Sequence, residues 1–175
     1  MAIAHTLGFD ELAVSPWANG RGQTVEIARE PRSGPFRWRL SVATIAAREQ
    51  FSAFDGVTRM LMPLGPDPLE LTVDGRSVRA EPLKVVTFAG DATVRALPAG
   101  TVRVLNLMVR GGDPDLRCVE VDGRWEAPAD ALALVALSPG LSSLGRSLRP
   151  YDAVVTVGTA SAVRGRGTVA VARLS

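Results

Sequence analysis

The sequence has very little of the residue types that build disulfides and transition-metal centres. It contains one cysteine, Cys118, which excludes an intrachain disulfide, and one histidine, His5. Protein sites for iron, manganese or zinc use several histidine or cysteine ligands, often with a carboxylate. One histidine cannot supply such a set, and no Asp/Glu cluster has a spacing suited to Mg²⁺ or Ca²⁺. We therefore expect no metal and no other cofactor.

Long apolar runs and clustered charge are also missing. No apolar stretch approaches the roughly 20 residues that span a bilayer, and the first residues lack the basic and apolar regions of a signal peptide. These absences predict a cytoplasmic protein with no membrane partner. Lys84 is the only lysine, and the arginines are interspersed with acidic residues to a net charge of +2. Nucleic-acid surfaces gather basic residues on one element, so we expect no nucleic-acid partner.

What the sequence does contain is a repeated two-residue alternation of apolar and polar side chains, which is typical of β-strands. We predict strands at 24–29, 36–45, 57–64, 68–73, 83–88, 93–98, 101–109, 116–121, 131–137, 152–157 and 167–174. Turn sequences separate them at 73–76, 89–92, 98–101 and 121–124, two of which contain Asp-Gly, a strong hairpin signal. Only 9–13 and the residues near Pro128 are expected to form single helical turns. The pattern predicts an all-β sandwich or barrel with very little helix.

A weak internal repeat relates the middle of the chain to its last third. The same offset relates Pro82 to Pro150, Val86 to Val154 and Gly90 to Gly158. The last third then has one residue fewer, and beyond that deletion Val102 corresponds to Val169 and Val104 to Val171. Each copy reads as proline, strand, glycine turn, strand, Gly-Thr-Val, strand. The repeat predicts two related β-sheets, and no linker separates them. We therefore predict one domain over 1–175. Its apolar sheets are compatible with a homodimer, although no interface is evident.

The segment 15–28, SPWANGRGQTVEIA, resembles the opening signature of the HutD/Ves family. The following blocks also resemble that family, in its order, through 36–45, 51–65, 86–91 and 104–110. The resemblance implies a metal-free double cupin (bicupin), with 15–112 as its first cupin-like half and 113–175 completing the second. It also implies an association with histidine-utilisation genes, and no established enzymatic activity. Arg21 stands where the family has a glycine, and we expect this to alter ligand preference.

The residues of these blocks supply candidate ligand contacts. Thr24 and Glu26 share one strand face, as do Arg39 and Ser41. An arginine that faces a pocket can grip a carboxylate with two hydrogen bonds, and an asparagine within an apolar strand needs partners from the backbone or from a ligand. The predicted ligand-binding residues are Trp17, Asn19, Gly20, Arg21, Gly22, Thr24, Glu26, Arg39, Ser41, Arg59 and Asn106.

Each of these residues also has a structural interpretation. The Asn-Gly-Arg-Gly loop is either an anion-binding nest of backbone N–H groups or a plain turn. Glu26 is either a buried acid/base group or the partner of a nearby arginine on a solvated face. The arginines are either pocket residues or members of ion pairs. The larger apolar side chains are expected to be core: Trp38, Phe51, Phe54, Met60, Met62 and Met108.

Three functions from different classes follow from these observations. The first is a protein that binds a small acidic metabolite, for sensing or buffering; the resemblance suggests an intermediate of histidine breakdown such as N-formylglutamate, formiminoglutamate or urocanate. The second is a metal-independent isomerase or hydrolase of small carboxylates that uses Glu26. The third is a protein-interaction module. No Gly-x-Ser-x-Gly motif is present to support nucleophilic catalysis.

Overall fold

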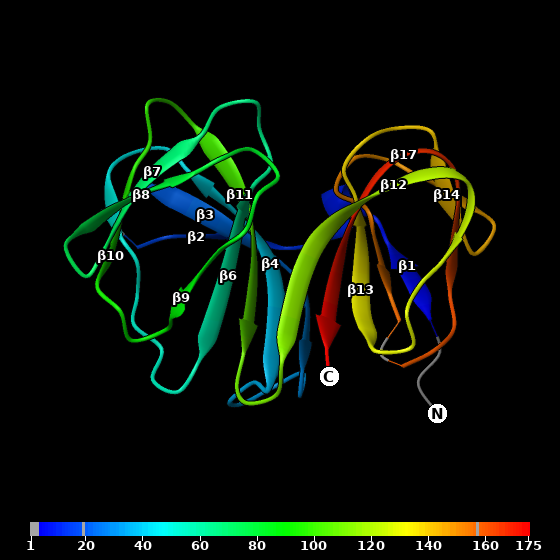
Figure 1. Cartoon of the computed structure of the whole chain (residues 1–175), viewed down its shortest axis with the longest axis horizontal. Coiled ribbons are helices and arrows are strands. Elements are labelled where there is room, and N and C mark those ends of the chain that lie inside the picture. The colour runs from blue at the N-terminus through cyan, green and yellow to red at the C-terminus, as the bar shows by residue number, and fades with distance from the viewer. Residues whose placement is uncertain (1–3, 19, 157) are drawn as a thin grey trace. The chain divides into compact units, whose positions relative to one another are not determined.

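The computed structural model describes residues 4–18, 20–156 and 158–175. Almost all regular structure in these residues is β-strand (Figure 1). The helix that accompanies the strands is a single 3-10 turn, η1 (Phe9–Glu11), and no helix in the described residues is long and apolar enough to cross a membrane. The predicted all-β class with very little helix is confirmed.

The chain divides into two compact units. The first unit is Ala13–Gly111, and the second unit combines Gly112–Ser175 with the N-terminal residues Met1–Leu12. The N-terminal segment joins the second unit because β1 (His5–Leu7) pairs with β16 (Ala153–Val155), far along the chain. The proposal that 1–175 behaves as one domain stays a prediction.

The first unit consists of two antiparallel sheets that enclose an apolar core. Leu61, Leu69 and Leu71 are among its fully buried side chains, from strands of both sheets. The six-stranded sheet has the order β2 (Val14–Pro16), β3 (Gly22–Glu30), β4 (Trp38–Ile45), β11 (Val102–Val109), β6 (Thr58–Pro63), β9 (Val86–Ala89). The four-stranded sheet has the order β5 (Glu49–Gln50), β10 (Val94–Leu97), β7 (Leu69–Val73), β8 (Arg76–Ala80).

The second unit consists of one sheet around its own core, in which Leu134, Val163 and Val171 are buried. Its longest ribbon pairs β12 (Pro114–Glu126) with β17 (Ala162–Leu174), and Cys118 lies on β12 opposite Ala170. The remaining path is β1, β16, β13 (Ala131–Ala136), β17, β14 (Leu141–Ser143), β15 (Arg146–Leu148).

The two units repeat one strand order. In the first unit the sequence of neighbours is β4, β11, β6, β9, and in the second unit it is β12, β17, β13, β16. Val104 on β11 and Val171 on β17, which the sequence repeat aligns, occupy the same place in these two orders. The internal repeat is therefore a repeat of sheet topology.

One of the two predicted Asp-Gly turns is wrong. At 73–76, Asp74 and Gly75 adopt positive φ values of 49° and 79° and connect the β7–β8 hairpin, as predicted. At 121–124, β12 continues without a turn, and Gly123 pairs with Gly165 on β17. Both glycines have positive φ, 98° and 117°. The backbone thus departs from ordinary strand geometry at this pair while the two strands stay paired. The predicted strand at 83–88 also begins late, because Leu83 has φ 58° and β9 starts at Val86.

Candidate functional site

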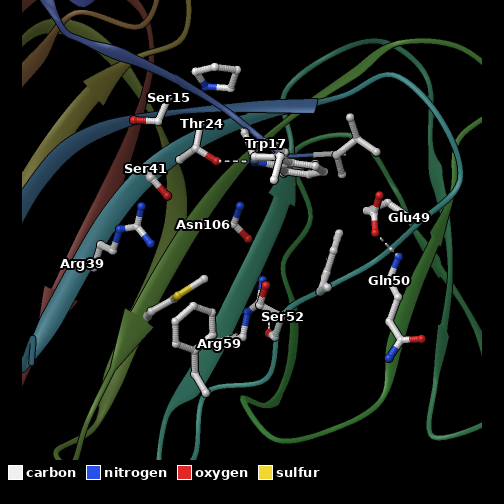
Figure 2. A pocket seen from close by; sticks show the side chains of 18 residues that line it. Ser15, Trp17, Thr24, Arg39, Ser41, Glu49, Gln50, Ser52, Arg59 and Asn106 are labelled. Carbon is white, nitrogen blue, oxygen red and sulfur yellow. Dashed lines mark hydrogen bonds between the residues drawn. The ribbon is translucent and has the colours of Figure 1, made fainter. Parts of the chain in front are cut away.

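The first unit encloses a cavity of about 490 Å³ beside the six-stranded sheet (Figure 2). This size lies within the range of small-molecule sites. Its walls combine a few polar groups with apolar and aromatic side chains: Ser15, Pro16, Trp17, Ala18, Thr24, Arg39, Ser41, Ala43, Ile45, Glu49, Gln50, Phe51, Ser52, Phe54, Arg59, Val104, Asn106 and Met108.

The pairing register places the polar side chains in two rows across neighbouring strands. Met108 on β11 lies opposite Arg39 on β4 and opposite Arg59 on β6. One step along the same face, Asn106 lies opposite Ser41. Because side chains on one face of a sheet recur every second residue, both arginines and the amide point to the same side. Figure 2 shows them directed into the cavity from the three strands.

Arg39 is held by one carboxylate. Its Nε donates a hydrogen bond to Oε2 of Glu26 at 2.7 Å, and the two side chains are 24% and 36% exposed. Within the part of the chain that the structure describes, no acceptor is recorded for the two Nη groups of Arg39. Glu26 thus orients the guanidinium while its outer edge remains available to a ligand.

Arg59 is a buried cation without a carboxylate partner among the described residues. The residue is 5% exposed, and its Nη1 donates to the backbone oxygen of Ser52 at 3.1 Å. Its guanidinium carbon lies 5.0 Å from the ring centre of Phe51 and 5.2 Å from that of Phe88, within cation–π range. Burial, together with repulsion from Arg39, lowers the pKa of Arg59 to about 10. The buried Nε has no hydrogen-bond acceptor in residues 4–18, 20–156 and 158–175.

Asn106 adds a second unsatisfied polar group to the same cavity. The residue is 5% exposed, and its Oδ1 is buried without a hydrogen-bond donor from the described part of the chain. Ser41, its cross-strand neighbour, is 2% exposed. Buried polar atoms in folded proteins almost always have partners, so an unpaired donor and an unpaired acceptor in one cavity indicate groups that await a ligand or water.

The signature loop supports one wall of the cavity. The indole N–H of Trp17 donates to Oγ1 of Thr24 at 2.9 Å, which fixes the ring against β3. A Cβ at Gly22 would lie 2.6 Å from the Thr44 oxygen and from the Trp17 ring, so only glycine fits there. The Gly20 N–H closes a turn by donating to the Trp17 oxygen. Gly20, Arg21 and Gly22 are absent from the cavity wall, and Asn19 lies outside the described residues.

The structure therefore brings together Trp17, Thr24, Arg39, Ser41, Arg59 and Asn106, as a wall of one cavity. It places Glu26 opposite Ser41 and outside the cavity wall. Glu26 pairs there with Arg39, which was the structural alternative to an acid/base role. The ligand contacts themselves stay predictions. Arg21 donates from Nη1 to the backbone oxygen of Arg48 at 3.2 Å, away from the cavity wall.

Three cavity residues were expected to be core only. Phe51 and Phe54 are half-buried and line the cavity, and so does Met108. The alternation on β11 already places Met108 on the face of Asn106, which was a usable signal. No comparable signal exists for Glu49, Gln50 or Ser52, because they lie on or beside the two-residue strand β5. Among the described residues, no three His, Cys, Asp or Glu side chains gather as a metal site.

Comparison with known proteins identifies relatives of the chain. The HutD family model matches residues 10–171. An uncharacterized 21.2 kDa protein in the hutC 3′ region of Pseudomonas putida is 39% identical over 97 residues, 53% of this chain and 51% of that protein. The protein Ves from Citrobacter koseri is 38% identical over 106 residues, 57% of this chain and 54% of that protein. The chain thus spans about half the length of the curated relatives it matches.

Solved structures match over the whole chain. A conserved protein of unknown function from Pseudomonas aeruginosa PAO1 has a TM-score of 0.87 at 27% identity, with 99% of this chain and 100% of that chain covered. HutD from Pseudomonas fluorescens SBW25, in a formate condition, has a TM-score of 0.81 at 28% identity and the same coverage. A cupin 2 conserved barrel protein from Leptotrichia buccalis, at 11% identity and TM-score 0.63, covers 100% of this chain and 98% of its own. The predicted double-cupin fold is confirmed.

Proposed function

The chain belongs to the HutD family, and on that premise we propose that it binds a small carboxylate metabolite in the cavity of the first unit. The observation that carries this proposal is the charge of the cavity wall. Arg39 and Arg59 both line it, and in the described residues only Arg39 has a carboxylate within ion-pair distance. A buried, uncompensated cation is unfavourable, so a ligand carboxylate is the complement that this wall lacks.

The hydrogen-bonding groups support the same ligand class. Arginine presents parallel N–H donors that match the two oxygens of a carboxylate. The Nη groups of Arg39 and the Nε of Arg59 have no acceptor among the described residues. A bound carboxylate between them would satisfy donors of both side chains and offset the desolvation of Arg59.

The remaining walls indicate a ligand with a short organic body. Phe51, Phe54 and Trp17 present aromatic surface, and Met108 forms the apolar floor between the arginines. Aromatic and thioether groups pack against carbon chains and flat conjugated groups. A cavity of about 490 Å³ accommodates a metabolite of this kind.

The family context narrows the candidates. The Pseudomonas putida relative is named for its place beside hutC, and the Pseudomonas fluorescens HutD structure is described for a formate condition. We propose an acidic intermediate of histidine breakdown, with N-formylglutamate, formiminoglutamate and urocanate as the compounds to test, and a role in sensing or buffering that compound in the cytoplasm. The enzyme alternative has less support, because Oε2 of Glu26 is engaged by Arg39.

Calorimetric titration and thermal unfolding with these compounds test the proposal. Ligand at about 100 times its dissociation constant should stabilise the protein by about 2.7 kcal/mol, a readily measured rise in melting temperature. Arg39→Gln and Arg59→Met should each remove most of the rise. Arg76→Gln deletes the same charge from the exposed strand β8 of the same unit and should keep it. Equal loss in Arg76→Gln, or no stabilisation by any of the carboxylates, would contradict the proposal.

A further inference from the structure

We propose that the second unit carries a separate binding site for a phosphate group. The site is a hollow of about 370 Å³ between β12, β17 and the turn that joins β14 to β15. The residues that define it are Arg124, Glu126, Leu144, Gly145, Ser161 and Arg164. None of them belongs to the carboxylate cavity, and they lie in the other unit.

The charge pattern of the β12–β17 ribbon gives the first argument. Arg124 lies directly opposite Arg164, an arrangement of like charges that destabilises a sheet unless it is compensated. Glu126 pairs with Arg124 at 2.5 Å. In the described part of the chain, no carboxylate lies within ion-pair distance of Arg164, whose neighbour on β14 is Ser142. The hollow therefore retains one uncompensated positive charge.

An arginine at a neighbouring position of the same ribbon has an acidic partner on the opposite strand. Two residues along, Arg166 lies opposite Asp122, and their side chains form an ion pair at 3.0 Å. At the position of Arg164 the opposing acid is replaced by Arg124. The ribbon thus provides a counterion for Arg166 but none for Arg164, which can take its counterion from solution.

Ser161 gives an independent argument for a ligand. The residue is 5% exposed and lines the hollow, and its buried Oγ has no hydrogen-bond partner among the residues that the structure describes. A buried hydroxyl without a partner is unfavourable, because it has lost its hydrogen bonds to water without replacing them. Arg124 and Arg164 line the same hollow as this hydroxyl. The three residues together offer donors for an ion with several oxygens, and a phosphate group has more acceptor oxygens than a carboxylate.

Leu144 suggests where the rest of a phosphorylated molecule would lie. Its side chain is 51% exposed, at the rim of the hollow. Free phosphate would contact only the arginines and Ser161, whereas a phosphate monoester would also pack its carbon chain against Leu144. Both sources share one recognition chemistry, and they differ in whether the apolar rim contributes.

Calorimetric titration of the whole chain with inorganic phosphate and with glycerol 3-phosphate, at constant ionic strength, tests the site. Both should bind saturably, and Arg164→Gln and Ser161→Ala should each weaken binding by about tenfold. Tighter glycerol 3-phosphate binding would identify a monoester, and equal affinity would identify free phosphate. Thermal unfolding of each variant checks that it folds.

Two matched variants separate this site from general charge effects. Arg76→Gln removes one positive charge from the first unit, and Arg117→Gln removes one from an exposed position of β12 outside the hollow. Both should bind phosphate as the unmodified protein does. The proposal is overturned if either variant loses as much affinity as Arg164→Gln, if Ser161→Ala keeps full affinity, or if neither ligand saturates.

Discussion

Asn106 and Arg173 occupy corresponding positions on β11 and β17, two residues beyond the aligned pair Val104 and Val171. Asn106 lies opposite Ser41, and Arg173 lies opposite Asp115. In the second unit Arg173 is satisfied by the chain itself, since it donates to Asp130 at 2.7 and 2.9 Å and reaches Asp115 at 3.4 Å. In the first unit the corresponding place is a cavity lined by arginines. One cupin half contains a guanidinium–carboxylate contact of the kind that we propose between the other half and its ligand.

This correspondence predicts that a built-in carboxylate will close the cavity. Ser41→Asp places an acid where the second unit has Asp115, on the same strand face as Arg39. The new carboxylate should pair with the cavity arginines and abolish the rise in melting temperature that we expect from N-formylglutamate. Ser41→Asn has similar size without the charge and should retain most of that rise. An unchanged rise in Ser41→Asp would show that the arginines do not bind the ligand.

Arg59 should be dispensable for stability although it is buried. Its pKa is lowered to about 10, so the folded state disfavours the charged form at every pH below that value, and this penalty relaxes only as pH rises through 10 towards the ordinary pKa of arginine. Arg59→Met removes the charge and fills similar space, so the free energy of unfolding at pH 7 should fall by less than about 1 kcal/mol. Arg59→Ala leaves a cavity and should lose about 2–4 kcal/mol. Urea unfolding of both variants measures the difference, and equal losses would refute this account.

Asp130 should make stability depend on pH in the acid range. Hydrogen bonds from Arg173 lower the pKa of Asp130 below its ordinary value of 3.8. An acid with a depressed folded-state pKa contributes stability that is complete above the unfolded value and is lost as pH falls through the folded value. Asp130→Asn should therefore be less stable than the unmodified protein at pH 7, and the difference should shrink below pH 3.8. Urea unfolding at pH 7 and pH 3 gives both values.

Asp122→Asn is the control for that experiment. Asp122 also pairs with an arginine, Arg166, but the two side chains are 76% and 84% exposed. Exposed ion pairs contribute little, about 0–1 kcal/mol, so this variant should differ slightly from the unmodified protein at both pH values. A pH-independent loss in Asp130→Asn would assign its effect to packing instead of ionisation.

Gly22 should be required for the wall that Trp17 forms. An added Cβ would lie 2.6 Å from the Thr44 oxygen and from two atoms of the Trp17 ring. Gly22→Ala must displace one of them, which we expect to lower the free energy of unfolding by about 1–3 kcal/mol and to weaken carboxylate binding. Gly100→Ala meets no atom within 4 Å and serves as the matched control. Tryptophan fluorescence with and without ligand reports the displacement, once a Trp17→Phe variant has given the contribution of Trp38 and Trp125.

Much of the fold follows from alternation in the sequence, because strands of the first unit have one buried face and local turn signals between them. The Asp-Gly turn at 121–124 failed as a prediction because a distant residue decides its conformation. Gly165 lies opposite Gly123, and a Cβ at Gly165 would lie 2.0 Å from the Gly140 oxygen. The chain can pass straight through at this point only because both paired residues are glycine.

The cavity was predictable where its residues lie on long strands, and not where they come from loops. Arg39, Arg59 and Asn106 stand out as polar residues within apolar strands. The loop that carries Ser52 and Phe54 has no periodicity, so its place on the wall depends on contacts such as the Phe54 N–H donating to the Gly90 oxygen. The signature loop drew attention to Gly22 for close approach to a ligand, whereas its neighbours are Trp17 and Thr44.

The pairing of β1 with β16 has a consequence for synthesis on the ribosome. All strands of the first unit emerge in one continuous stretch, so that unit can fold while the rest is still being made. In the second unit β1 leaves the ribosome early and must wait for β16, and β17, which pairs with β12, β13 and β14, emerges last. The cavity of the first unit can therefore form during translation, whereas the sheet of the second unit closes only once β16 and β17 have emerged.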